Sequence, residues 1–188
     1  MRTGNSFLGK DKIIAATRSD EEFSRALIES PSVIFDLSPD LMSITNKVAK
    51  AHEAGKKYLL HIDLARGLGK DESGIRFLKR VGVDGIISTK VNIIKMARES
   101  GMHTVQRFFI VDSRSVDTTV EAIKSAKPDM VEIMPGIVYK VIGSLGAMVD
   151  VPIIAGGLID RAHEVYEALA HGAAAVSTGC PEIWNVKI

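Results

Sequence analysis

The sequence predicts an α/β protein that folds as one compact (β/α)8 TIM-type barrel with short loops, and two observations lead to this prediction. Short apolar runs rich in β-branched residues recur roughly every 20 to 26 residues, each followed by a segment with helical periodicity. The runs are continuously apolar, which is typical of parallel strands covered by helices on both faces. Eight such units indicate a closed barrel, although about 250 residues is more usual for this fold.

Eight segments carry the strand pattern, namely residues 12–17, 32–38, 57–63, 84–89, 103–111, 129–134, 152–157 and 173–178. A doubly wound open sheet is the alternative architecture for this order of elements. The stretch GLGKDESG (67–74) is glycine-rich, but its glycine spacing differs from that of a dinucleotide-binding fingerprint. We therefore expect the closed barrel, as a single domain over residues 1–188.

Six segments place apolar residues at steps of three and four, as an amphipathic helix does, namely residues 23–30, 41–55, 75–82, 92–101, 120–128 and 162–172. The candidate N-terminal caps or first-turn acids are Asp20, Asp40, Asp71, Ser115 and Asp160. Four of the helices are expected to end at a glycine, namely Gly55, Gly82, Gly101 and Gly172.

Composition narrows the function classes. The chain has 188 residues, a formal net charge of +1 and 46% apolar residues, which suits an ordinary globular core. Proteins that hold nucleic acid by charge alone are usually far more basic, so any RNA binding must come from a local patch or from oligomer geometry. No signal-peptide core and no run of about 20 apolar residues is present, which predicts a cytoplasmic protein without a membrane partner.

Small and hydroxyl residues at the ends of the last two strands predict a phosphate site. In barrels of this type, the loops after the seventh and eighth strands often hold a phosphate group. Bare glycine backbone lets N–H groups approach an anion, and hydroxyl groups add donors. The candidate phosphate-binding residues are Gly156, Gly157, Ser177, Thr178 and Gly179. The alternative is that both segments are ordinary tight turns.

Residues at the ends of other strands are candidate contacts for the rest of a small ligand, namely His61, Asp63, Lys90, Gln106, Arg107, Glu132 and Gly136. His61 and Asp63 are two residues apart, so we expect them to share a strand face. Glu132 interrupts an apolar run, so it either reads a ligand or pairs with a buried Lys or Arg. Arg107 or Arg114 could clamp an anion or face nucleic acid, or be solvated at the rim.

The pattern indicates binding more than catalysis. No nucleophile, base and orienting group stand together, and no Cys/His cluster has metal-ligand spacing, so we expect no cofactor and no metal. A Schiff base on Lys90 is a weaker interpretation than a counter-charge for phosphate or an exposed lysine. The single cysteine, Cys180, excludes an intrachain disulfide, and Trp184 is expected to pack the short last helix onto the barrel.

Six segments follow one another in a fixed order, namely HIDLARGLGKDESGIRFL (61–78), DGIISTKVNIIKMAR (84–98), TVQRFFIVDS (104–113), PDMVEIMPGIVYKVI (128–142), PIIAGGLI (152–159) and AVSTGCPEIWN (175–185). Together they resemble the glycerol-3-phosphate-responsive antiterminator family, the glycerol uptake operon regulators of bacteria. The resemblance implies a barrel that senses glycerol 3-phosphate, binds the leader mRNA of a glycerol-catabolism operon and prevents a terminator from forming.

Three hypotheses follow from the sequence. The first is a non-enzymatic regulator that binds glycerol 3-phosphate and leader mRNA, either as a monomer or as a homo-oligomer. The second is a barrel enzyme acting on a small phosphorylated triose or polyol, with His61 and Glu132 as an acid–base pair. The third is a scaffold with a vestigial site. The basic residues Arg66, Lys70, Arg76, Lys79 and Arg80 are candidate RNA contacts, but alternating charges favour a solvated face there.

Overall fold

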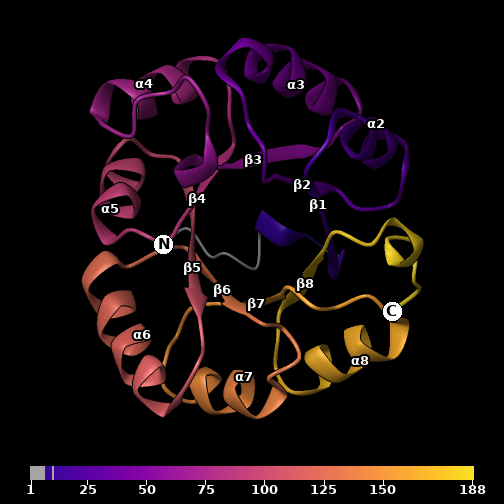
Figure 1. Cartoon of the computed structure of the whole chain (residues 1–188), viewed down its shortest axis with the longest axis vertical. Coiled ribbons are helices and arrows are strands. Elements are labelled where there is room, and N and C mark those ends of the chain that lie inside the picture. The colour runs from indigo at the N-terminus through magenta and orange to yellow at the C-terminus, as the bar shows by residue number, and fades with distance from the viewer. Residues whose placement is uncertain (1–6, 10) are drawn as a thin grey trace.

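A computed structural model describes residues 7–9 and 11–188 and shows a closed barrel of eight parallel strands in sequence order (Figure 1). The strands are β1 (Ile13–Thr17), β2 (Val33–Asp36), β3 (Lys57–His61), β4 (Gly85–Ser88), β5 (His103–Phe109), β6 (Met130–Met134), β7 (Ile153–Gly156) and β8 (Ala175–Thr178). Each strand lies within a predicted segment, and β8 pairs with β1 to close the ring. The barrel prediction is confirmed and the open sheet is excluded.

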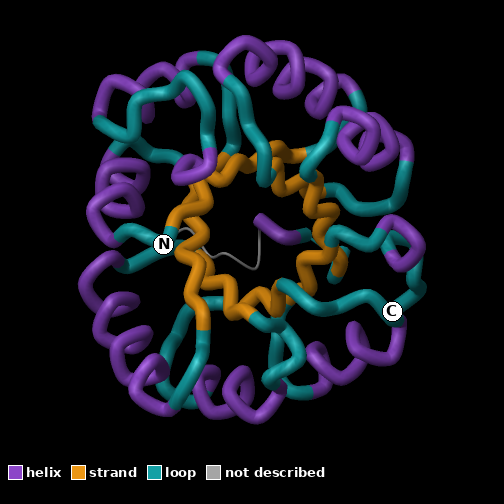
Figure 2. The backbone as a smooth tube through the Cα atoms, viewed as in Figure 1, coloured by secondary structure: helices purple, strands orange, loops and turns teal. Residues whose placement is uncertain are grey.

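Helices surround the ring of strands on the outside (Figure 2). They are α2 (Asp20–Ile28), α3 (Leu41–Glu53), α4 (Glu72–Arg80), α5 (Val91–Glu99), α6 (Ser113–Ala126), α7 (Tyr139–Gly146) and α8 (Ala162–Ala170). Two short 3₁₀ helices, η1 (Ile62–Leu64) and η2 (Pro181–Ile183), follow β3 and β8. Each α-helix buries an apolar stripe against the sheet, which explains why both faces of the strands are apolar.

Side-chain hydrogen bonds cap the N-termini of several helices. The carboxylates of Asp40 and Asp71 accept hydrogen bonds from the first-turn amides of α3 and α4, so both predicted caps are confirmed. Asp20 lies in the first turn of α2, one residue after the cap. Helix α8 differs, because Glu164 accepts hydrogen bonds from the amides of Asp160 and the next residue. Asp160 therefore precedes this helix and does not cap it with its side chain.

Two helices differ from the sequence prediction. Helix α6 begins at Ser113, seven residues before the predicted segment, because Asp112 caps it and Ser115 completes a capping box. The first turns of α6 are polar and exposed, so they carry little apolar periodicity. Helix α7 was not predicted, because it is eight residues long, contains Gly143 and Gly146, and buries only two of its side chains.

The register sorts strand residues into two faces. One apolar cluster fills the inside of the barrel, and it includes Ile14, Ala16, Phe35, Leu59, Ile87, Val105, Met130, Ile154 and Ala175. The residues between them in sequence pack outward against the helices. Side chains in a strand alternate with a period of two, so the inner face continues beyond this cluster to polar residues at the carboxyl ends of the strands. These are His61, Arg107, Glu132 and Ser177, together with Gly156.

The N-terminal segment closes the opposite end of the barrel. Phe7 and Leu8 are buried in the inner cluster, and Figure 2 shows this short helical segment within the ring of strands. The ring of Phe7 lies 4.1 Å from that of His103, and its carbonyl accepts a hydrogen bond from Lys57 Nζ. Both partners are the first residues of their strands. The opening on the other side, at the carboxyl ends of the strands, is where the candidate site lies.

Candidate functional site

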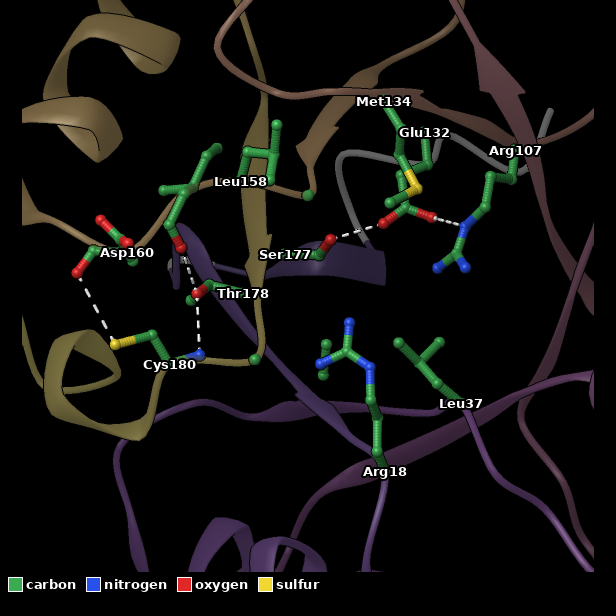
Figure 3. A pocket seen from close by; sticks show the side chains of 14 residues that line it. Arg18, Leu37, Arg107, Glu132, Met134, Leu158, Asp160, Ser177, Thr178 and Cys180 are labelled. Atoms are coloured by element: carbon green, nitrogen blue, oxygen red, sulfur yellow. Dashed lines mark hydrogen bonds and ion pairs between the residues drawn. The ribbon is translucent and has the colours of Figure 1, made fainter.

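A cavity of about 230 Å³ opens among the carboxyl ends of β1, β5, β6, β7 and β8 (Figure 3). Its lining includes Arg18 from the loop after β1, Arg107 from β5, Glu132 and Met134 from β6, the segment 157–160 after β7, and the segment 177–180 of β8 and its loop. The two segments predicted to hold phosphate therefore lie side by side here. Barrel proteins place their ligand sites at this end of the strands.

A hydrogen-bonded chain of three side chains forms one wall of the cavity. Arg107 Nε donates to Glu132 Oε2 at 2.6 Å, and Ser177 Oγ donates to Glu132 Oε1 at 2.5 Å. Arg107 is 6% exposed and Glu132 1% exposed, so the charges would be costly without each other. Of the two roles considered for Glu132 in the sequence, pairing with a buried arginine is the one that the structure shows.

Arg18 places a second guanidinium in the cavity, and the sequence-based list of site residues missed it. Figure 3 shows its side chain pointing into the cavity from the side opposite Met134 and Leu158. Among the described residues, no hydrogen bond or ion pair engages its guanidinium group. Its place directly after an apolar strand was the only signal in the sequence. Arg18 therefore supplies the positive charge of this cavity that no carboxylate balances.

Protein side chains occupy the space beside the glycines of the site. A Cβ on Gly156 would collide with Glu132 Oε1 and lie 2.7 Å from Ser177 Oγ, so this glycine makes room for the buried carboxylate. Gly157 has a φ of 75°, and Met134 Cε lies against it. Gly136 packs beneath the loop after β7 and donates its amide to the carbonyl of Gly157. These glycines are required by the packing of the wall.

Backbone amides line the same cavity. Among the described residues, the amides of Gly157, Leu158 and Gly179 donate no hydrogen bond within the protein. Leu158 itself has a φ of 58°, an unusual conformation for a side chain of this kind. Backbone N–H groups that have no acceptor within the protein can donate hydrogen bonds to a bound anion. The hydroxyl of Thr178, in contrast, already donates to the carbonyl of Ile159 at 2.7 Å.

His61 and Asp63 do not share a strand face, because β3 ends at His61 and Asp63 lies in η1. The carboxylate of Asp63 accepts hydrogen bonds from the Ser88 hydroxyl and from the amide and hydroxyl of Thr89. Burial raises the pKa of this carboxyl, but the hydrogen bonds from Thr89 and Ser88 outweigh it, so its pKa is lowered. Asp63 therefore ties the end of β3 to the end of β4.

His61 is buried on the inner face, and its Nδ1 atom has no hydrogen-bond partner among the described residues. Burial, together with the nearby charge of Arg107, lowers the pKa of His61 to about 4. The imidazole is therefore neutral near pH 7. A neutral imidazole with an open ring nitrogen can accept or donate one hydrogen bond.

Of the seven predicted ligand residues, Arg107 and Glu132 line this cavity, whereas His61, Asp63, Lys90, Gln106 and Gly136 do not. Gln106 is fully buried on the outer face of β5, paired in register with Ser88, so its amide faces the helix layer. Lys90 is exposed at the start of α5 and is absent from the cavity lining. The sequence pattern could not separate them from Arg107, because the side on which each strand residue points depends on the register of the barrel.

The thiol of Cys180 is not set up as a nucleophile. Burial and a hydrogen bond to Glu182 raise the pKa of this thiol, which disfavours the thiolate. Trp184 packs beneath the same loop, with Nε1 donating to the carbonyl of Thr178 at 2.9 Å.

Within the described part of the chain, no group of three His, Cys, Asp or Glu residues could hold a metal ion. In the same residues, no helix is long and apolar enough to span a bilayer.

Fold and cavity together define a (β/α)8 barrel protein with a small, arginine-lined site at its mouth. A model of the family described as glycerol-3-phosphate responsive antiterminator matches residues 13–184. The chain therefore belongs to the glycerol-3-phosphate responsive antiterminator family, and the resemblance seen in the sequence is confirmed.

Three known proteins are similar to this chain over most of its length. The uncharacterized protein YgcP of Escherichia coli (strain K12) is 35% identical over 180 residues, which cover 95% of this chain and 94% of that protein. The crystal structure of the glycerol uptake operon antiterminator regulatory protein from Listeria monocytogenes has a TM-score of 0.90 at 33% identity, covering 96% of this chain and 98% of that one. A glycerol uptake operon antiterminator-related protein from Thermotoga maritima has a TM-score of 0.83 at 32% identity, covering 93% and 98%.

Proposed function

We propose that this protein binds glycerol 3-phosphate and acts as a transcription antiterminator on the leader mRNA of a glycerol-catabolism operon. The observation that carries the proposal is the convergence of two guanidinium groups, from Arg18 and Arg107, on one small cavity (Figure 3). Membership of the antiterminator family supports both the ligand and the regulatory role.

In this proposal the phosphate group lies between Arg18 and the loops after β7 and β8. The charge of Arg107 is already balanced by Glu132, so Arg18 provides the uncompensated positive charge. The amides of Gly157, Leu158 and Gly179 supply neutral donors on the same side. Arginine and backbone amides are the usual partners of phosphate oxygens in proteins.

The glycerol end of the ligand then lies deeper, toward the inner face of the barrel. The Glu132 carboxylate has lone pairs beyond those used by Arg107 and Ser177, and a hydroxyl group can donate to them. His61, on the inner face outside the cavity lining, is the second candidate for a hydroxyl contact. Its ring is neutral, and among the described residues its Nδ1 atom has no hydrogen-bond partner, with Asp63 Oδ2 at 3.9 Å. The phosphate and hydroxyl contacts together would favour a polyol phosphate over either inorganic phosphate or glycerol.

We propose binding without turnover. The enzyme alternative requires His61 and Glu132 to exchange protons near neutral pH, where an acid or base works best with a matching pKa. His61 has a pKa of about 4, far below neutral pH, so it is poorly matched to that role. Both carboxylate oxygens of Glu132 are engaged by Arg107 and Ser177, so its main contacts are structural.

Calorimetric titration with glycerol 3-phosphate, glycerol and inorganic phosphate tests the ligand. We expect glycerol 3-phosphate to bind most tightly and to be recovered unchanged. A labelled leader transcript in a gel shift, with and without glycerol 3-phosphate, tests the regulatory role. RNA retention that ignores the ligand contradicts the sensor, and turnover of a phosphorylated triose supports the enzyme alternative.

A further inference from the structure

We propose that the rim formed by the loops after β4, β5 and β6 is the RNA-docking surface, and that it takes single-stranded RNA. The inference rests on the proposed function, because it assigns the RNA-binding half of that function to a place on the molecule. Exposed apolar side chains, unpaired cations and a connection to the ligand cavity support it.

Exposed apolar side chains cluster on this rim. Phe109 at the end of β5 is 57% exposed, Val111 in the loop that follows is 84% exposed, and Ile137 after β6 is 39% exposed. Of these three, Val111 also lines a groove of about 390 Å³ between α6 and α7, together with Val116 and Val141. An exposed aromatic ring such as that of Phe109 is a platform on which an unpaired base can stack.

Each of the three loops, or the first turn of the helix that follows it, also carries a cation without an ion-pair partner among the described residues. Lys90 precedes α5, Arg114 lies in the first turn of α6, and Lys140 lies in the first turn of α7, where it also lines the groove. All three are exposed, and within the described chain no ion pair or side-chain hydrogen bond engages their charged groups. Within residues 89–91, 109–116 and 137–141, these three cations outnumber the one carboxylate, that of Asp112, which caps α6. The charge of this rim is therefore complementary to a polyanion whose bases reach Phe109.

The basic residues on the loop after β3 and on α4 are less suited to this role. Arg66 and Arg76 each form an ion pair with a carboxylate, while Lys70 and Lys79 donate to backbone carbonyls. Binding RNA there would require these contacts to be given up. Arg80 makes no such contact among the described residues, but it lies in the last turn of α4, at the end of the barrel opposite the ligand cavity. RNA binding at the rim after β4, β5 and β6 would not break contacts of this kind.

Two strands connect this rim to the ligand cavity. Arg107 and Phe109 are two residues apart on β5, so the strand that places Arg107 in the cavity wall also places Phe109 at the rim. Phe109 pairs in register with Met134, which lines the cavity and lies against Gly157. A ligand that engages Arg107 or moves Met134 thus acts on the position of Phe109. It shifts the protein toward RNA binding if it binds that arrangement more tightly.

The first test is Phe109→Ala, measured by fluorescence anisotropy with the labelled leader transcript and with single-stranded poly(U), at saturating glycerol 3-phosphate. We expect RNA affinity to fall about tenfold or more, because base–aromatic stacking is lost. The matched control is Tyr166→Ala, which removes an exposed aromatic ring from α8. It should bind RNA as the unaltered protein does, and calorimetry with glycerol 3-phosphate should show that Phe109→Ala is still folded and binds ligand.

The second test removes the three rim cations together, as Lys90→Gln, Arg114→Gln and Lys140→Gln. Each phosphate contact on a single strand contributes about 0.7 to the slope of log affinity against log salt, so the slope should fall by about 2. The control removes three exposed cations from the last turns of helices at the other end of the barrel, as Lys50→Gln, Arg98→Gln and Lys124→Gln. Its slope should be unchanged.

The outcomes separate this inference from the proposed function. If the unaltered protein binds leader RNA in a ligand-dependent way and both rim variants bind it equally well, the rim is not the docking surface and the proposed function stands. If the unaltered protein with glycerol 3-phosphate binds no RNA, the regulatory half of the proposed function and this inference both fail. Photo-crosslinks from 4-thiouridine RNA that map only outside residues 89–91, 109–116 and 137–141 also overturn the inference.

Discussion

Arg107 and Glu132 are partners in register on β5 and β6, and their side chains meet at 2.6 Å inside the barrel mouth. Removing one member leaves the other as a buried, unpaired charge. We therefore expect Arg107→Met to lower the free energy of unfolding by about 3–5 kcal/mol. The double variant Arg107→Met, Glu132→Gln should recover part of this loss. Urea unfolding of both variants measures it, and additive effects would show that the pair is not coupled.

Gly156 is required by the carboxylate beside it. In Gly156→Ala the new methyl group would collide with Glu132 Oε1 and crowd Ser177 Oγ, so we expect a loss of about 1–3 kcal/mol in stability. Gly143→Ala is the control, since the nearest atom to its new methyl group is a carbonyl oxygen at 3.6 Å and the residue lies inside α7. That change should stabilise by about 0.5–1 kcal/mol. Thermal or urea unfolding compares the two, and equal effects would rule out the clash.

We expect the substitution Arg18→Ala to weaken ligand binding and to leave the free energy of unfolding almost unchanged. Its side chain is exposed and unpaired among the described residues, so Arg18→Ala should change the free energy of unfolding by less than about 0.5 kcal/mol. Loss of a charge-assisted hydrogen bond should weaken glycerol 3-phosphate binding by about 1.5–3 kcal/mol. Calorimetry beside Arg98→Ala, an arginine at the far end of the barrel, measures this. Unchanged affinity would move the phosphate away from Arg18.

His61 should make the protein less stable at mildly acidic pH. The pKa of an unfolded histidine is about 6.5, whereas burial and Arg107 lower that of His61 to about 4. Between these values the unfolded chain binds a proton that the folded chain does not. The contribution of neutral His61 is therefore complete above the unfolded pKa, and it falls by up to about 1.4 kcal/mol per pH unit as the pH drops toward the folded value.

Urea unfolding at several pH values between about 6.5 and 4 measures this dependence. His61→Gln keeps a polar side chain of similar size but cannot titrate, so its stability should fall less steeply with acid. Parallel curves of stability against pH for the two proteins would show that His61 has the same pKa in the folded and unfolded states.

The barrel fold was predictable from the sequence because the strand pattern recurs once for each of its eight strands. Eight buried strands with apolar residues on both faces leave eight similar runs in the sequence, and glycines with positive φ follow the helices at Gly55, Gly82, Gly101 and Gly172. Helix α7 leaves a much weaker signal, because its stripe is two buried residues and its glycines resemble loop punctuation.

The details of the site were less predictable, because they depend on where strands end and on which way side chains point. Glu132 was recognised as a charge in an apolar run, but its partner became clear only from the register of β5 and β6. Gln106 and Arg107 are adjacent in sequence and face opposite sides of the sheet. Arg18 stands out only because the closed barrel brings the end of β1 next to the loop after β8.

The single tryptophan of the chain offers a direct optical readout of the cavity. Trp184 is buried, and its indole N–H donates a hydrogen bond to the carbonyl of Thr178. Thr178 also lines the cavity. Indole emission depends on the polarity and hydrogen bonding around the ring, so a ligand that shifts this loop changes the fluorescence of one known residue. Binding can thus be followed in the unlabelled protein, in real time and at low concentration.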